Sequence, residues 1–171
     1  MSGYLTARSR RRGAFTLIEI LIVIGIIGLL ATMGAVAGGG ALKKARDTKR
    51  KSDLAQFGRF FAISCPMPDA GPGEHDFAVI VSELKAKNPQ IAQLVGRIPR
   101  DPRRGSDTES YYRYLVSADG RKCAVYANLE NAAEVVTNTR ITAPEAGGGT
   151  GVLRGANVGW NGTDRYFQVS N

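Results

Sequence analysis

Glu19 is the residue of this 171-residue chain whose position most clearly requires a chemical explanation. It is the only charged side chain from Phe15 to Leu42, and it stands at the edge of an uncharged, mainly apolar run, Ile20 to Leu42. A carboxylate costs about 2.5–3.5 kcal/mol at the centre of a bilayer and less near the interface. Glu19 therefore predicts a positively charged partner. The alternative is a first-turn helix residue whose side chain reaches the aqueous interface.

Residues suited to catalysis are few. His75 is the only histidine, and with Cys65 and Cys123 it offers three zinc ligands at no recognised zinc spacing, which favours a surface histidine. The run 147–149 is three glycines without the following Lys-Ser/Thr of a phosphate-binding loop, so it predicts a loop only. The triplet 161–163 fits a glycosylation sequon, a pattern that also arises by chance. The sequence thus predicts no enzyme, no cofactor and no metal site.

Cys65 and Cys123 both follow the apolar run. An even number of cysteines in an exported body predicts one disulfide. It would close a long loop, which is worth about 4 kcal/mol in a chain-entropy estimate. The alternative is two buried free thiols.

The formal net charge of +8 is concentrated on both sides of the apolar run. Residues 1–14 hold four Arg and no acid, residues 43–53 hold six Lys or Arg and two Asp, and residues 54–171 are close to neutral. This distribution suggests a membrane boundary more than a nucleic-acid-binding face, so nucleic acid is a possible partner without support. For the basic neck, residues 43–53, we expect a solvated helix face; anionic lipid, DNA and acidic patches are alternative partners.

These residues require a long N-terminal helix to position them. The apolar run is long enough to span a bilayer, and Leu54, Phe57 and Phe61 recur at helical spacing after it. We predict one helix over residues 15–64, with 20–42 as its transmembrane part and Cys65-Pro66 as its end. A secretory signal peptide cut near residues 35–37, which would export an enzyme, is the alternative; the run is longer than a signal's apolar core.

Residues 65–171 predict an exported α/β head. Asp76 is a plausible N-cap for a short amphipathic helix through Phe77 and Leu84, and a second short helix is expected over 88–96. The predicted strands are a hairpin, 112–116 and 123–129, and a last strand, 165–169. The predicted fold class is α+β: a long hydrophobic-then-amphipathic N-terminal helix packed on a small antiparallel β-sheet.

The segment from Arg10 to Ile24 resembles the processing site of type IV prepilins and type II secretion pseudopilins. That family has a basic leader, a small residue at the cut, Phe, three further residues, Glu and an apolar helix. In this chain, residues 1–14 match the leader, Ala14 the small residue, Phe15 the Phe and Glu19 the Glu. Three later segments are loosely similar to the β-region of major pseudopilins, namely 98–102, 112–114 and 126–130. The resemblance implies a pilin-like fold.

The resemblance also implies a reaction done to this chain. In the family, a membrane aspartyl peptidase removes the leader and methylates the new N-terminus, here Phe15. The usual residue before Phe is Gly, whereas this chain has Ala14 preceded by Gly13. A cut between Ala14 and Phe15 keeps the family spacing to Glu19, and a cut after Gly13 is the alternative. The new α-amine, with a reference pKa of about 8, could then pair with Glu19 of a neighbouring subunit.

The implied function is a structural subunit of a type IV pilus or a type II secretion pseudopilus. Its partners would be prepilin peptidase, an assembly ATPase, an inner-membrane platform protein, membrane lipid and further copies in a homo-oligomeric filament. Basic residues on both sides of the apolar run leave the positive-inside rule undecided. We place the body outside the cytoplasmic membrane because the leader must face the cytosolic peptidase. The alternative is a single-pass membrane-anchored binding protein that does not polymerise.

Overall fold

The computed structural model describes residues 15–90 and 95–171, without the side chains of residues 34–38. The chain divides into two units, one that ends at Gly39 and one that comprises Gly40–Asn171. Helix α1, Leu17–Phe61, begins in the first unit and continues into the second. The predicted helix 15–64 is therefore confirmed in kind, although it starts two residues later and ends three residues earlier. The chain leaves the helix before Cys65, which bonds to a strand of the second unit.

The described part of the first unit is a helix without a core. Every described side chain from Phe15 to Met33 is exposed, including the large apolar ones. Within the residues that the structure describes, no helix combines the length and the apolarity needed to cross a membrane. The transmembrane segment predicted over 20–42 is therefore not shown by the structure.

The second unit contains a five-stranded antiparallel sheet with the strand order β1-β2-β3-β5-β4. The predicted hairpin is confirmed as β2, Arg113–Val116, and β3, Cys123–Asn128. The predicted last strand is β5, Arg165–Ser170. Two strands were not predicted: β1, Gly73–Asp76, and β4, Gly151–Arg154. Both are only four residues long, and β1 is mostly polar, so neither shows a clear alternation of apolar and polar residues.

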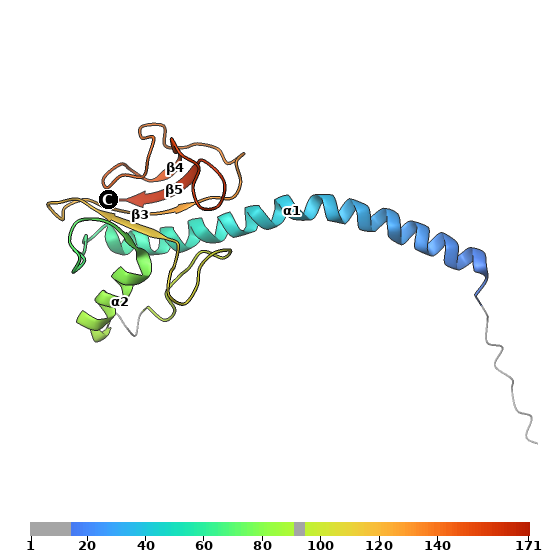
Figure 1. Cartoon of the computed structure of the whole chain (residues 1–171), viewed down its shortest axis with the longest axis horizontal. Helices are drawn as coiled ribbons and strands as arrows, with labels where there is room; N and C mark the ends of the chain where they lie inside the picture. Colours follow the sequence, from blue (N-terminus) through green and yellow to red (C-terminus); the bar gives the residue numbers. More distant parts are fainter. Residues whose placement is uncertain (1–14, 91–94) are drawn as a thin grey trace, which may run out of the picture. The chain divides into compact units, whose positions relative to one another are not determined.

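The C-terminal half of α1 packs on one face of this sheet (Figure 1). Leu54 and Phe61 are buried there, and the helix approaches β5 so closely that a Cβ on Gly58 would lie 2.1 Å from Cγ1 of Val169. A side chain at position 58 would therefore push the helix away from the sheet. This packing confirms the α+β class predicted from the sequence.

Helix α2, Phe77–Lys87, completes this core and confirms the first predicted short helix. Its cap is also confirmed, since Asp76 Oδ1 accepts a hydrogen bond from the backbone N–H of Ala78 at 2.8 Å. The ring of Phe77 lies 5.1 Å from that of Phe57 on α1. The second predicted short helix, 88–96, falls largely on residues 91–94, which lie outside the described residues; Pro89 and Gln90 are helical.

The other face of the sheet carries a smaller aromatic core. Tyr126, Leu153 and Tyr166 are buried there, with Trp160 packed against them. The loop containing Gly147 borders the sheet as well, because its backbone N–H donates to the Ser170 hydroxyl at 2.7 Å. The sheet is therefore covered on both faces.

Candidate functional site

The candidate processing site lies at the start of the described chain. Gly13 and Ala14 are outside the described residues, and Phe15 is the first residue with a defined position, with 81% of its surface exposed. Helix α1 begins two residues later. Phe15 thus stands just before the helix and is accessible to another molecule.

Glu19 lies in the first turn of α1 and forms a capping box with Thr16. Its Oε2 accepts hydrogen bonds from the backbone N–H of Thr16 at 2.9 Å and from the Thr16 hydroxyl at 2.8 Å, and the backbone N–H of Glu19 donates to Thr16 Oγ1 at 3.3 Å. Among residues 15–90 and 95–171, no Lys or Arg side chain comes within 4 Å of this carboxylate. The Glu19 charge is therefore balanced by no cation of the described chain.

Both of these side-chain hydrogen bonds use Oε2 of Glu19. The second oxygen, Oε1, accepts no hydrogen bond from any described residue. An ammonium group arriving from another molecule could bind Oε1 without breaking the cap. Glu19 can therefore hold the first turn of its own helix and accept an external cation at the same time.

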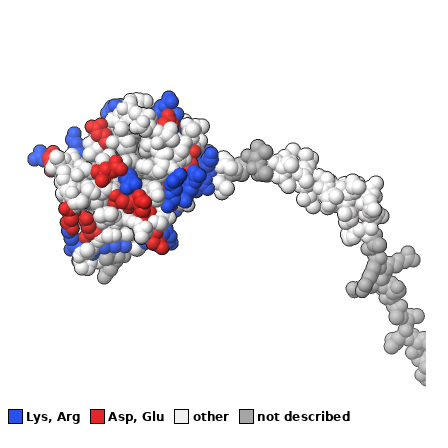
Figure 2. Space-filling view, viewed as in Figure 1, with Lys and Arg blue, Asp and Glu red and all other residues white. Residues whose placement is uncertain are grey.

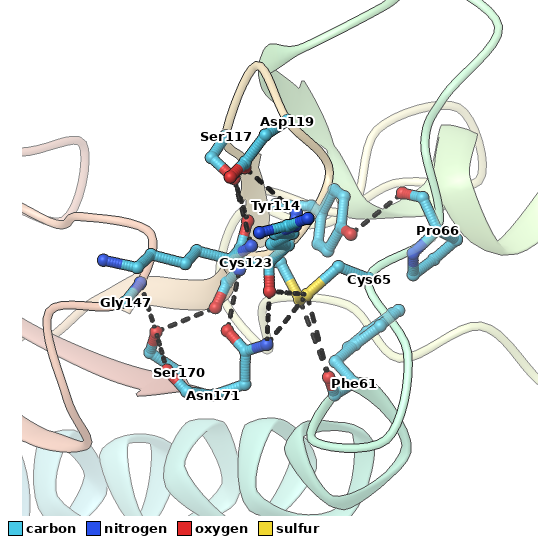
Figure 3. The surroundings of a disulfide bond; sticks show 12 residues. Phe61, Cys65, Pro66, Tyr114, Ser117, Asp119, Cys123, Gly147, Ser170 and Asn171 are labelled. Atoms are coloured by element: carbon cyan, nitrogen blue, oxygen red, sulfur yellow. Dashed lines mark hydrogen bonds between the residues drawn. A yellow bond between two sulfur atoms is a disulfide. The ribbon is translucent and has the colours of Figure 1, made fainter.

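Cys65 and Cys123 form a disulfide, with their Cα atoms 5.6 Å apart (Figure 3). The bond ties the segment that follows α1 to the first residue of β3. Two hydrogen bonds reinforce it: the Tyr114 hydroxyl donates to the Pro66 carbonyl at 2.9 Å, and the Cys123 backbone N–H donates to Asn171 Oδ1 at 2.8 Å. The end of the helix, the sheet and the last residue thus meet at one place.

A second junction between α1 and the rest of the second unit is a largely buried charge cluster, made of Arg46, Asp47, Arg50, Asp101 and Glu130. The side chain of Arg50 is 0% exposed and binds three carboxylates. Its Nε and Nη2 donate to Asp101 at 2.8 and 3.0 Å, Nη2 also donates to Glu130 at 2.7 Å, and Nη1 donates to Asp47 at 2.7 Å. Arg46 adds two bonds to Glu130, at 2.7 and 2.6 Å.

The pKa values in this cluster favour the charged forms. Burial alone would raise the pKa of Asp101, but hydrogen bonds from Arg50, Asn161 and the backbone outweigh it and lower that pKa. Burial likewise opposes the charge of Glu130, and the two arginines still lower its pKa. For Arg50, burial disfavours the cation, yet its three carboxylate partners raise the pKa. These shifts favour the ionised forms of Asp101, Glu130 and Arg50 at neutral pH.

The expectation of a solvated helix face for the basic neck is wrong for the side of α1 that faces the sheet. Arg50 is buried, Arg46 is paired with Glu130, and Lys51 is paired with Glu134. The sequence reasoning missed this because two of the three partners of Arg50, Asp101 and Glu130, lie 51 and 80 residues away along the chain. A usable signal existed, since Asp101 and Glu130 belong to two of the three segments that resemble pseudopilins.

The same cluster explains the sequon at 161–163. Asn161 is only 5% exposed, and its Nδ2 donates to Asp101 Oδ2 at 2.9 Å and to the Asn128 carbonyl at 2.8 Å. An asparagine amide held in this way is not accessible to a glycosylating enzyme. The structural role of Asn161 therefore accounts for its presence without a glycan.

His75 lies on β1, partly buried, with Nε2 2.9 Å from the Gly71 carbonyl. Within the described residues, no group of three or more His, Cys, Asp or Glu side chains is arranged to hold a metal ion. A groove of about 680 Å³ lies between α1, α2 and residues 95–105, and its described lining residues include no His, Cys, Ser or Thr.

Comparison with known proteins identifies the N-terminal segment. Residues 9–35 match the family described as the prokaryotic N-terminal methylation motif. The chain carries the methylation motif of type IV pilin-like proteins. The matched range contains Gly13, Ala14, Phe15 and Glu19. No curated protein and no solved structure matches the chain.

The motif marks a family of structural, pilin-like proteins and not a family of enzymes. In general it implies a membrane-anchored precursor, processing by prepilin peptidase and assembly into a surface filament. The resemblance seen in the sequence at Arg10–Ile24 is thereby confirmed.

Proposed function

We propose that this pilin-like chain is the precursor of a filament subunit, cut between Ala14 and Phe15, methylated on Phe15 and then polymerised. The single observation that carries the proposal is the methylation motif over residues 9–35. The filament is a type IV pilus or a type II secretion pseudopilus. The pseudopilin-like segments at 98–102 and 126–130 favour the pseudopilus.

The exposed apolar surface of α1 supports a membrane stage. Large apolar side chains cover this part of the helix, and Ile24 and Leu30 are each 61% exposed. A surface of this kind is unfavourable in water and has to be covered by lipid or by protein. We assign the single span in the cytoplasmic membrane to residues 20–42, with the body outside, until other subunits replace the lipid in the filament.

The capping geometry of Glu19 gives the proposal a mechanism. Before cleavage, the nitrogen of Phe15 is an uncharged amide; after cleavage, it is a cationic amine, largely protonated at neutral pH. Because Oε1 of Glu19 carries no bond within the described chain, it can accept the amine of an adjacent subunit while Oε2 keeps the Thr16 cap. A carboxylate that is costly in an isolated subunit becomes paired on assembly.

Glu19→Gln tests this pairing because glutamine is nearly isosteric and its side-chain carbonyl can still cap Thr16. We expect leader removal to continue and filament assembly to be lost, as measured by N-terminal mass spectrometry and by electron microscopy of sheared filaments. Glu19→Ala, which removes the charge and the cap together, is the companion variant and should also fail to assemble. Normal filaments from Glu19→Gln would refute the charge pairing.

N-terminal mass spectrometry of the mature protein separates the competing functions. A chain that starts at N-methylated Phe15 supports the filament subunit, and one that starts at Ala14 relocates the cut to the bond after Gly13. An intact Met1 would favour the membrane-anchored binding protein that does not polymerise. A start beyond Ala35 would favour an exported enzyme.

A further inference from the structure

We propose that a basic rim on the second unit, formed by Lys43, Lys44, Arg103 and Arg104, binds the phosphate groups of anionic phospholipids at the membrane surface through Lys43, Lys44 and Arg104. The inference rests on the proposed function, because it requires the apolar run that ends at Leu42 to lie in the bilayer. It adds a lipid-recognition surface, with named residues, to a subunit that waits in the membrane for assembly.

The fold brings the two parts of the rim together. Lys43 and Lys44 directly follow Leu42 on α1, whereas the two arginines belong to the loop that starts at Asp101. Arg103 Nη1 lies 3.6 Å from Glu130 Oε2, the same oxygen that Arg46 Nη2 binds at 2.6 Å.

Arg46 is one helical turn beyond Lys43, so the loop stands beside this part of the helix. Figure 2 shows Lys and Arg side chains gathered where α1 enters the unit.

The rim also holds positive charge that the fold does not neutralise. The three carboxylates of the buried charge cluster are matched by three arginines: Arg46, Arg50 and Arg103. Elsewhere in the neck, Lys49 pairs with Asp53 at 3.1 Å and Lys51 pairs with Glu134.

The remaining rim cations, Lys43, Lys44 and Arg104, are exposed, and no carboxylate of the described residues lies within 4 Å of them. Three exposed cations are therefore available to an external anion.

The position of these cations favours lipid over nucleic acid. Leu42, with 60% of its surface exposed, ends the apolar run immediately before Lys43. A helix that leaves the hydrocarbon region at this residue delivers the next side chains to the layer of lipid phosphates. The long stems of Lys and Arg can lie along the acyl boundary while their charged ends reach those phosphates.

The test uses the full chain in micelles of a neutral detergent, with native mass spectrometry to measure retained lipid. Phosphatidylglycerol and phosphatidylcholine are titrated separately. The test variant combines Lys43→Gln, Lys44→Gln and Arg104→Gln, and it keeps Arg46 and Arg103 so that Glu130 stays paired. The matched control removes three exposed cations near the disulfide end of the unit, through Arg59→Gln, Arg121→Gln and Lys122→Gln.

We expect the unmodified chain to retain phosphatidylglycerol in preference to phosphatidylcholine. Each of the three available cations should contribute about a fivefold effect, so the triple variant should lose about 100-fold in phosphatidylglycerol affinity. The control should stay close to the unmodified chain. Far-UV circular dichroism checks that each variant is folded.

Equal retention of the two lipids, or an equal loss in the control, would overturn the proposal. Displacement of the lipid by inorganic phosphate would indicate a site for free anions, and displacement by a short DNA duplex would indicate a nucleic-acid surface; either result rejects the lipid assignment. The assay uses single subunits and does not require cleavage or polymerisation. A failure here is therefore separate from a failure of the Glu19 experiments.

Discussion

Arg50→Met removes the centre of the buried charge cluster and should destabilise the second unit strongly. The variant deletes four charge-assisted hydrogen bonds to Asp47, Asp101 and Glu130, all with donor–acceptor distances of 2.7–3.0 Å. It leaves their carboxylates in a site from which the 0% exposed arginine had excluded water. Removing one partner of a buried ion pair typically costs 3–5 kcal/mol, because the other charge remains buried without compensation.

The structure places the expected loss near the lower end of this range, at about 3 kcal/mol. Asp47 keeps hydrogen bonds from the backbone N–H groups of Glu130 and Asn131, and Asp101 keeps those of Arg103 and Arg104. Glu130 also keeps its two bonds to Arg46. These donors partly compensate the orphaned carboxylates. For a unit of this size, the melting temperature should fall by roughly 10 °C.

Urea unfolding of the full chain in mild detergent, followed by far-UV circular dichroism, measures the loss. Lys49→Met is the matched control, since Lys49 is the neighbouring helix residue but its side chain is 56% exposed and pairs only with Asp53. An exposed pair contributes at most about 1 kcal/mol. A loss below about 1 kcal/mol in Arg50→Met would refute the reasoning.

The pH dependence provides a second criterion for the same variant. In the unmodified chain, folding lowers the pKa values of Asp101 and Glu130. Their contribution to the free energy of unfolding is therefore complete above their pKa values in the unfolded chain, which are about 4, and is lost as the pH falls through their pKa values in the folded chain. Without Arg50, burial should raise the pKa of Asp101, and protonation should then favour the folded state. The stability gap between the two proteins should therefore narrow from pH 7 to pH 5, and a constant gap would contradict this account.

Two further predictions concern the packing of α1 on the sheet. Gly58→Ala places a Cβ 2.1 Å from Cγ1 of Val169 and should lower the free energy of unfolding by about 1–3 kcal/mol through overpacking, as measured by urea unfolding. Adding Val169→Ala should recover part of this loss. Gly96→Ala is the control, because its new Cβ meets nothing within 4 Å. Replacing Cys65 and Cys123 together by Ser should lower the free energy of unfolding by about 4 kcal/mol, and an unchanged urea midpoint would show that the disulfide contributes nothing.

Much of the architecture could be predicted because its signals are local. The long helix follows from an unbroken apolar run and helical spacing, the hairpin from two strand-like segments around a turn, and the α2 cap from a single aspartate. The strands β1 and β4 could not be predicted in this way. Each has four residues and is held by its pairing with another strand, β1 with β2 and β4 with β5.

The candidate processing site can be recognised in the sequence because its motif is contiguous. Gly13, Ala14, Phe15 and Glu19 are recognisable by type and spacing alone. The role of the basic neck is different. Whether Arg50 contacts solvent or lies buried depends on Asp101 and Glu130, which are far away in the chain. Only the packing of α1 on the sheet decides which Lys and Arg side chains of the neck are neutralised and which remain for an external anion.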